Sequence, residues 1–304
     1  MTERTKKNAI GALGAALRAG KPLPRDRKVT LLVATDFSPA ADVAVDVAVE
    51  LAARSGARVV LLHLVTLAPI AHADFVWVPT AQEIEGATRK ADAALRATVA
   101  RIRARETNVE IESVIVDGLL PDDLVGAIAD RTPDLVVVGT HGRGYWSNLV
   151  LGSVTRAVVR RSPSPVLTVR PEGMDPAATT ILAPIELGAV VEEALDFAVG
   201  LSSITGGKLR LLYTFPASDE LDLDGGAAAA SDIALKAQVA LEQLAGPERA
   251  RAMQVESATR FGRPARQISS EAKACRAAFV VMGIHDRSFV NRTIHGSVAE
   301  DEIG

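Results

Sequence analysis

The sequence contains little cysteine, few aromatic residues and no long hydrophobic run. Cys275 is the single cysteine among 304 residues, which excludes an intrachain disulfide and a cysteine metal cluster and fits a reducing compartment. Aromatic residues make up only 4% of the chain, so a platform of stacked rings for single-stranded nucleic acid is not expected. The longest unbroken apolar run, Ala277 to Met282, is far shorter than the roughly 20 residues that span a bilayer. We therefore expect a folded cytoplasmic protein without a membrane segment.

The charges are unevenly distributed along the chain. The formal net charge is −3, but residues 1–27 hold seven basic side chains against Glu3 and Asp26. The rest of the chain is acidic, which makes it a poor partner for nucleic acid. Ile10, Leu13 and Leu17 would lie on one helical face of the basic tail, so we expect either a short docking helix or a frayed tail there.

Residues 28–170 alternate between short apolar runs and amphipathic helical patterns. The apolar runs predict five strands, at residues 29–35, 59–65, 109–116, 135–138 and 165–169. Their apolarity is largely continuous, which indicates a parallel sheet covered on both faces. Four helices are expected between the strands, beginning after Ser38, near Ile84, at Pro121 and at Ser153. This order predicts a doubly wound, Rossmann-like α/β domain whose ligands bind beyond the carboxyl ends of its strands.

The same pattern recurs after a linker at residues 171–178. Thr180 to Ile185 corresponds to Thr30 to Thr35 at an offset of 150 residues, and Gly296-Ser297 corresponds to Gly152-Ser153 at an offset of 144. An internal duplication therefore predicts a second parallel-sheet domain at residues 179–304. This copy ends eight residues after Gly296, so we expect it to lack most of its last helix and all of its last strand.

A glycine-rich loop follows the fourth strand of the first copy. It begins with Gly139, has a second glycine at Gly142 and ends at Gly152-Ser153-Val154, where a helix starts. Glycines let the backbone approach a ligand closely, and the N–H groups at a helix start attract phosphate. The alternative is structural: Ser153 would only cap the helix, and the glycines would only turn the chain.

In these motifs the sequence resembles the universal stress protein family, in particular its tandem two-domain members. The resemblance rests on Ala34-Thr35-Asp36-Phe37-Ser38 after strand one, Leu62-His63-Leu64, Gly118 with Pro121, and the glycine motif. It covers residues 28–170 fully and residues 178–304 in degraded form.

In the nucleotide-binding branch of that family the glycine motif holds the phosphates of ATP, so the resemblance implies ATP, together with magnesium, as the ligand of the first domain. Asp36 and the backbone of Leu64 would face the adenosine. The remaining expected site residues line the pocket or the triphosphate, and they are Val138, Gly139, His141, Gly142, Arg143, Gly152, Ser153 and Val154.

Several of these residues have a second interpretation. Asp36 could accept hydrogen bonds from ribose or adenine, or it could cap the first helix. Arg143 and Arg156 could offset phosphate charge or could be solvated surface residues. A metal site at His141 is not expected, because no carboxylate or cysteine cluster accompanies it at ligand spacing.

The second copy carries acidic residues where the first has its motif. Asp286 stands in place of Gly142, Glu300 in place of Arg156, and Glu186 in place of Asp36. Like charges disfavour a triphosphate at these positions. We therefore expect the second domain to have a structural or regulatory role instead of a second ATP site.

These patterns favour a stress-response or regulatory protein that binds ATP in its first domain, over a scaffold of the same fold that binds no nucleotide. An ATP-using enzyme is not favoured, because no Walker sequence and no Ser-Gly-Gly-x-Asp pyrophosphate loop occurs.

The missing last strand would leave Phe279 to Met282 at a sheet edge, which predicts a homodimer, or a monomer if Ala9 to Leu17 covers that edge.

Overall fold

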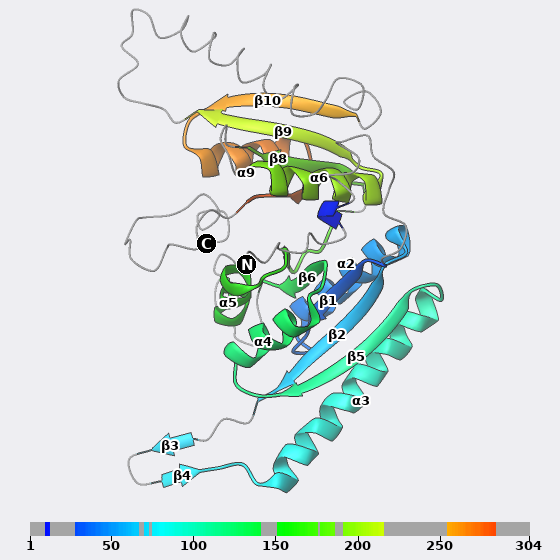
Figure 1. The fold of residues 1–304 in the computed structure, drawn as a ribbon, viewed down its shortest axis with the longest axis vertical. Coiled ribbons are helices and arrows are strands. Elements are labelled where there is room, and N and C mark those ends of the chain that lie inside the picture. The colour runs from blue at the N-terminus through cyan, green and yellow to red at the C-terminus, as the bar shows by residue number, and fades with distance from the viewer. Residues whose placement is uncertain are drawn as a thin grey trace, which may run out of the picture. The chain divides into compact units, whose positions relative to one another are not determined.

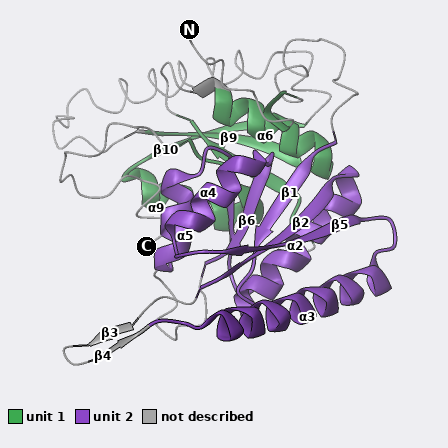
Figure 2. Cartoon of the chain, turned by 60° about the horizontal axis from the view of Figure 1, so that its bottom comes forward, with its two compact units in different colours: residues 1–26, 175–304 green, residues 27–174 purple. Residues whose placement is uncertain are grey.

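The computed structural model describes residues 10–12, 28–66, 70–72, 75–140, 151–175, 177–185, 191–215 and 254–283. The chain divides into two compact units, which we call the first domain (residues 27–174) and the second domain (residues 175–304 together with residues 1–26) (Figure 2). The boundary falls within the stretch expected to be a linker. The N-terminal segment, in contrast, belongs to the second domain although it precedes the first in sequence.

A five-stranded parallel sheet forms the centre of the first domain. Its strands are arranged in the order β5-β2-β1-β6-β7, so that β1 lies in the middle (Figure 1). Their bounds are β1 Thr30–Ala34, β2 Arg58–Val65, β5 Glu110–Asp117, β6 Leu135–Gly139 and β7 Val166–Val169. The apolar runs are buried as expected, with Val33, Val136 and Val137 fully enclosed. The predicted doubly wound α/β fold is thereby confirmed.

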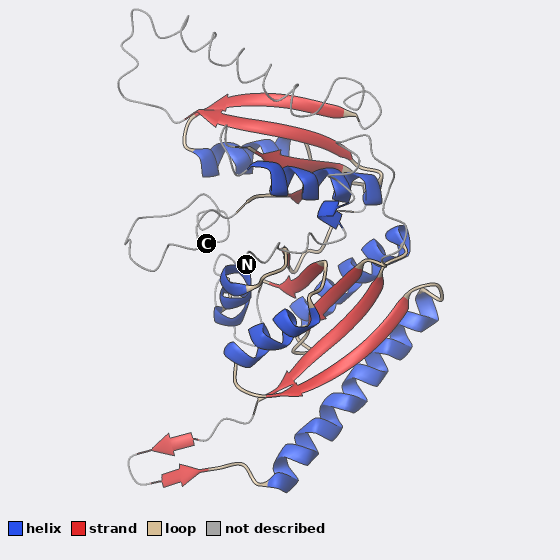
Figure 3. Ribbon diagram, viewed as in Figure 1, coloured by secondary structure: helices blue, strands red, loops and turns tan. Residues whose placement is uncertain are grey.

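Four helices connect these strands: α2 Pro39–Ser55, α3 Ala81–Arg105, α4 Asp122–Arg131 and α5 Ser153–Arg161. Helix α2 begins with Ser38 as N-cap and Pro39 in its first turn, and it ends at Gly56, whose φ of 69° is the left-handed conformation that glycine adopts freely. Helices lie on both faces of the sheet (Figure 3). The sequence did not predict a short antiparallel pair before α3, β3 Ile70–His72 with β4 Phe75–Trp77.

The second domain repeats this plan with fewer elements. Its described residues form a four-stranded parallel sheet in the order β10-β9-β8-β11, with bounds β8 Thr180–Pro184, β9 Lys208–Phe215, β10 Val255–Phe261 and β11 Ala277–Val280. Two helices are described, α6 Val191–Thr205 and α9 Pro264–Ala274. In this part of the chain β11 is at the sheet edge, whereas its counterpart β6 is followed by β7. The expected shorter second copy is therefore confirmed.

The two copies differ in what fills the space between the sheet and the helix that follows the third strand. In the first domain Val60, Ala127 and the partly buried Val116 belong to one apolar core cluster. At the corresponding positions the second domain has Arg210, Glu271 and Arg260. The Glu271 carboxylate is only 2% exposed and lies 2.6 Å from each of the two guanidinium groups. An ion cluster thus stands where the first copy has hydrocarbon.

Within the described part of the chain, no helix is both long and apolar enough to cross a membrane.

Candidate functional site

The carboxyl ends of the three central strands of the first domain lie next to one another. Ala34, the last residue of β1, pairs with β2 on one side and with Val138 of β6 on the other. Asp36 follows two residues later, Leu64 lies near the end of β2, and Gly139 ends β6. Four of the expected site residues are thus brought to one edge of the sheet, which is where doubly wound domains bind their ligands.

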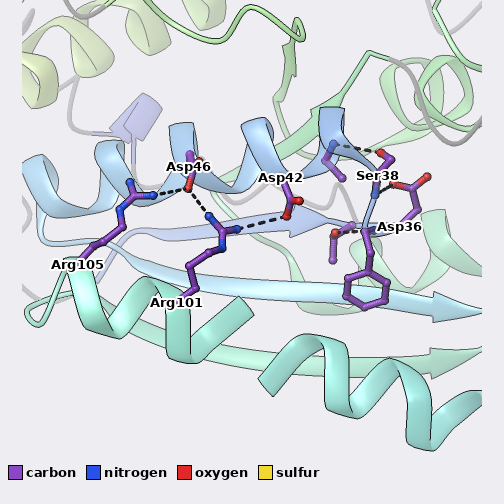
Figure 4. Close-up of polar contacts among 9 residues, drawn as sticks. Asp36, Ser38, Asp42, Asp46, Arg101 and Arg105 are labelled. Carbon is purple, nitrogen blue, oxygen red and sulfur yellow. Dashed lines mark hydrogen bonds and ion pairs between the residues drawn. The ribbon is translucent and has the colours of Figure 1, made fainter. Parts of the chain in front are cut away.

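Hydrogen bonds hold the turn that follows β1 in a defined shape. The Oδ1 atom of Asp36 accepts the Ser38 N–H at 3.0 Å, and the Oγ atom of Ser38 accepts the Ala41 N–H at 3.2 Å (Figure 4). Ser38, and not Asp36, is therefore the cap of α2, so the capping interpretation of Asp36 is wrong. The Asp36 carboxylate instead closes a local turn at the strand end.

Phe37 lies at the centre of this turn in an uncommon backbone conformation. Its φ is 60°, a left-handed conformation that costs a bulky residue roughly 1–3 kcal/mol. Its N–H donates to Thr35 Oγ1 at 3.1 Å, and its ring lies 4.4 Å, centroid to centroid, from the ring of His63 on β2. Backbone strain of this kind concentrates at functional sites, where the surrounding contacts maintain it.

His63 connects β2 to the same turn. Its Nδ1 atom lies 2.7 Å from the carbonyl oxygen of Thr35. A carbonyl oxygen only accepts, so Nδ1 carries the hydrogen and donates it, and Nε2 of the neutral ring is then an acceptor. The pairing of Phe37 with His63 was not predicted from the sequence. The signal for it was the position of both rings at the carboxyl ends of adjacent strands.

The start of α5 is attached to the end of β6. The Gly152 N–H donates to the Thr140 carbonyl at 2.9 Å, and Thr155 Oγ1 donates to the Gly139 carbonyl at 2.9 Å. Gly152 is the N-cap of α5, and no side-chain hydrogen bond caps this helix within the described residues. The exposed Ser153 is the first helical residue, so the interpretation of Ser153 as the cap is wrong. The first turn of α5, whose backbone N–H groups have no partner inside the helix, thus begins at this edge of the sheet.

The two described glycines of the motif have different reasons to be glycine. A Cβ at Gly139 would lie 2.8 Å from the carbonyl oxygen of Ala40, because β6 passes very close to α2. A Cβ at Gly152 would meet its nearest atom, the Thr140 carbonyl oxygen, at an ordinary 3.5 Å, and the φ of −56° suits any residue. Packing therefore explains Gly139, whereas nothing within the described residues requires glycine at position 152.

Other expected residues of the motif lie outside the described residues. These are His141, Gly142 and Arg143 of the first copy and Glu186, Asp286 and Glu300 of the second. Arg156 is described, and its Nη2 atom donates to the Leu151 carbonyl at 3.4 Å. The structure thus places Asp36, Leu64, Val138, Gly139, Gly152, Ser153 and Val154 around the carboxyl edge of one sheet.

Comparisons with known proteins agree with this architecture. A universal stress protein of Archaeoglobus fulgidus superposes with a TM-score of 0.67 at 19% identity, over 90% of this chain and 94% of that one, which shows the fold. A universal stress protein of Methanocaldococcus jannaschii is 24% identical over 151 residues, which is 46% of this chain and 93% of the relative. A universal stress protein of Mycobacterium tuberculosis is 30% identical over 171 residues, 55% of this chain and 57% of the relative.

The chain therefore matches little more than half the length of the mycobacterial relative. A sequence model of the universal stress protein family matches it twice, at residues 30–170 and 178–303. Those two matches coincide with the two parallel sheets. The chain belongs to the universal stress protein family, as a tandem two-domain member.

Proposed function

We propose that the first domain binds ATP at the carboxyl edge of β2, β1 and β6, and that the protein is a cytoplasmic stress-response protein and not an enzyme. The observation that supports this most is the start of α5. It is attached to the end of β6 through Gly152 and Thr155 and has no side-chain cap within the described residues. An anionic group placed there would receive backbone hydrogen bonds and the favourable end of the helix dipole.

The phosphate end of the proposed ligand lies at Gly152, Ser153 and Val154. No packing contact among the described residues requires glycine at position 152, which fits a position that a ligand approaches closely. The Ser153 hydroxyl is exposed and adds one donor. Gly142 and the charged Arg143, with His141 between the glycines, would complete the phosphate loop. Magnesium would be bound mainly by the phosphates, since no cluster of three metal-ligating side chains occurs among the described residues.

The nucleoside end of the proposed ligand lies at Asp36, Leu64 and Val138. The Asp36 carboxylate lies just beyond the carboxyl end of β1, and as an acceptor it would bind a ribose hydroxyl or an adenine amino group. Leu64 and Val138 lie near the ends of β2 and β6, the two strands that flank β1, and their backbone would line the adenosine pocket while their side chains belong to the apolar core. The strained turn at Phe37 holds this carboxylate at a fixed position before any ligand arrives, which lowers the entropic cost of binding.

The experiment is a calorimetric titration of the full chain with ATP and magnesium, with Gly142→Asp as the critical variant. This substitution copies the residue of the second domain and brings both bulk and like charge to the phosphate loop. A loss of about 3 kcal/mol would weaken binding more than a hundredfold. Glu106→Asp, which alters a carboxylate just after α3, far along the chain from the motif, is the matched control and should bind as the parent does. Unchanged affinity in Gly142→Asp would contradict the proposed location.

A scaffold that binds no nucleotide is the second candidate, and the close approach of Gly139 to Ala40 favours it. In that case packing would account for the first glycine of the motif and no ligand would be needed. The two functions differ in a simple measurement. Adenine nucleotide released from purified, heat-denatured protein supports the ATP site. A calorimetric titration that shows no heat of binding at millimolar ATP supports the scaffold.

A further inference from the structure

The N-terminal segment contacts the first helix of the second domain. Residues 10–12 are helical, and the Ile10 side chain is only 1% exposed. A Cβ added to Gly200 would overlap the carbonyl oxygen of Ile10 and would lie 3.1 Å from its Cγ2 atom. The backbone of the segment thus lies directly against α6, as the position of residues 10–12 beside α6 in Figure 1 also shows.

Glycine at position 200 is costly for the helix itself. It lies in the interior of α6, where glycine is less favourable than alanine by roughly 1 kcal/mol. The corresponding residue of the first domain is Glu50, which is half exposed and pairs with Arg54 along α2. The repeat therefore tolerates a long side chain at this position of the helix. Glycine at 200 is explained by the close approach of Ile10 to this helix.

The face of α6 around Gly200 also contains a buried acidic residue. Asp196 lies one helical turn before Gly200, on the same face, and is 3% exposed. Its counterpart in the first domain is Asp46, which pairs with Arg101 at 3.1 Å and with Arg105 at 3.2 Å (Figure 4). In the first copy this face of the helix is thus matched by positive charge.

The net charges of the segment and the second domain are complementary. Residues 1–27 hold seven basic and two acidic side chains, while residues 178–304 hold 17 acidic and 12 basic side chains. Opposite net charges favour association of the basic segment with the acidic domain. The apolar contact of Ile10 supplies the buried anchor, and the charges supply the preference for this domain.

We propose that the α6 face formed by Asp196 and Gly200 is a docking surface whose ligand is the chain's own basic N-terminal segment. The second domain then binds this segment. Docking joins the second domain to the start of the first by a connection additional to the linker, and it holds the basic segment on an acidic domain. This inference is independent of ATP binding, because it rests on residues of the second domain and the tail alone.

Hydrogen exchange of the full chain, followed by mass spectrometry, tests the docking. In the parent protein the backbone amides of peptides covering residues 8–14 should be protected. Gly200→Glu, which writes the first domain's residue into α6, should speed their exchange about tenfold or more, because the added side chain occupies the position of Ile10. The matched control is Gly126→Glu in the interior of α4, where a Cβ meets nothing within 4 Å and where exchange at residues 8–14 should not change.

Peptides from β8 and β9 serve as the internal check that the second domain stays folded. If Gly200→Glu unfolds them, Ile10→Asp decides the matter, because it removes the apolar anchor without altering α6. Faster exchange at residues 8–14 in Ile10→Asp supports the docking surface. The proposal is overturned by unprotected amides in the parent, by unchanged exchange in Gly200→Glu with a folded second domain, or by an equal effect of Gly126→Glu.

Discussion

At the scale of single residues, the candidate site is a set of short-range constraints that hold polar groups in place before any ligand binds. Ser38 caps α2, Asp36 closes the preceding turn, and Phe37 is held at a φ of 60° between them. Thr155 attaches α5 to the Gly139 carbonyl from inside the helix. Together these contacts fix the geometry of the ends of β1 and β6 and of the starts of α2 and α5.

Two alanine substitutions distinguish a glycine needed for packing from a glycine needed for ATP binding. Gly139→Ala should destabilise the first domain by about 1–3 kcal/mol, because its Cβ would lie 2.8 Å from the Ala40 carbonyl oxygen. Gly152→Ala should cost no more than about 1 kcal/mol, the loss expected when alanine replaces a better N-cap residue. Its affinity for ATP should nevertheless fall about tenfold, because the methyl group faces the proposed phosphates. Thermal denaturation and calorimetry measure the two effects, and parental affinity in Gly152→Ala would contradict a phosphate site there.

Sequence analysis identified the residues at the strand ends but not the interactions among them. Asp36, Leu64, Val138 and Gly139 could be placed because buried strands end where their apolar runs end. The left-handed Phe37 and its contact with His63 could not be placed. They depend on the register between β1 and β2, which brings together residues 26 positions apart and leaves no periodic signal.

At the scale of secondary structure elements, the two copies solve the same packing problem with different chemistry. Apolar side chains fill the space beneath α4, whereas Glu271 binds Arg210 and Arg260 beneath α9. Arg210 also pairs with Glu256 on β10 at 2.8 Å. Replacing a buried ion cluster by hydrocarbon is often neutral or stabilising, while removing one partner alone is costly.

The contribution of the ion cluster to stability can be tested by replacing it with the apolar residues of the first domain. Glu271→Ala should lower the free energy of unfolding of the second domain by about 2–3 kcal/mol, less than for a fully buried cluster because both arginines reach solvent. The triple variant Arg210→Val, Arg260→Val and Glu271→Ala copies Val60, Val116 and Ala127. It should be as stable as the parent or more stable in urea denaturation. If the triple variant had a lower free energy of unfolding than Glu271→Ala, the ion cluster would be a net source of stability.

The capping box at the start of α3 should lose its stabilising effect at acidic pH. The Glu83 carboxylate accepts the Thr80 N–H and hydroxyl, each at 2.8 Å, and these hydrogen bonds lower the pKa of Glu83 below its ordinary value. Since the pKa is lower in the folded state, the stabilisation is complete above the unfolded pKa of about 4.3 and is lost as the pH falls through the folded pKa. A carboxyl titration by NMR should show this depression, and Thr80→Ala should abolish it. An ordinary Glu83 pKa in the parent would rule out the capping box in solution.

The elements themselves were largely predictable. All five strands of the first domain lie within two residues of their expected positions, because each is an apolar run bounded by turn residues. The pair β3 and β4 was missed, since Ile70–His72 and Phe75–Trp77 are only three residues long each and carry no countable alternation. Helix α4 begins at Asp122, one residue after the expected Pro121.

At the scale of the whole molecule, the chain consists of two copies of one domain that have diverged. The internal offset of 150 residues at the first strand and 144 at later landmarks was visible in the sequence, and the two sheets share strand order up to the last strand. The assignment of residues 1–26 to the second domain was not foreseen. It depends on the approach of Ile10 to Gly200, a contact between segments 190 positions apart.

Homodimer formation is expected because β11 lies at the sheet edge within the described residues. Val280 at this edge is 39% exposed, and an apolar strand edge favours pairing with another chain. The segment considered as an alternative cover, Ala9 to Leu17, is described only at residues 10–12, where Ile10 lies against α6. We therefore expect a homodimer. Light scattering behind gel filtration should give about twice the chain mass of 31.9 kDa, and a mass equal to one chain at micromolar concentration would contradict the dimer.

The number of ATP molecules bound per chain shows directly whether nucleotide binds in the first domain alone. Only the first domain combines Asp36 with the glycines of the motif, whereas the second has Glu186, Asp286 and Glu300 at the matching positions. Calorimetric titration of the full chain with ATP and magnesium should therefore give a stoichiometry near one, and Gly142→Asp should abolish the heat of binding. A stoichiometry near two, or no binding at millimolar ATP, would contradict a single nucleotide site in the first domain.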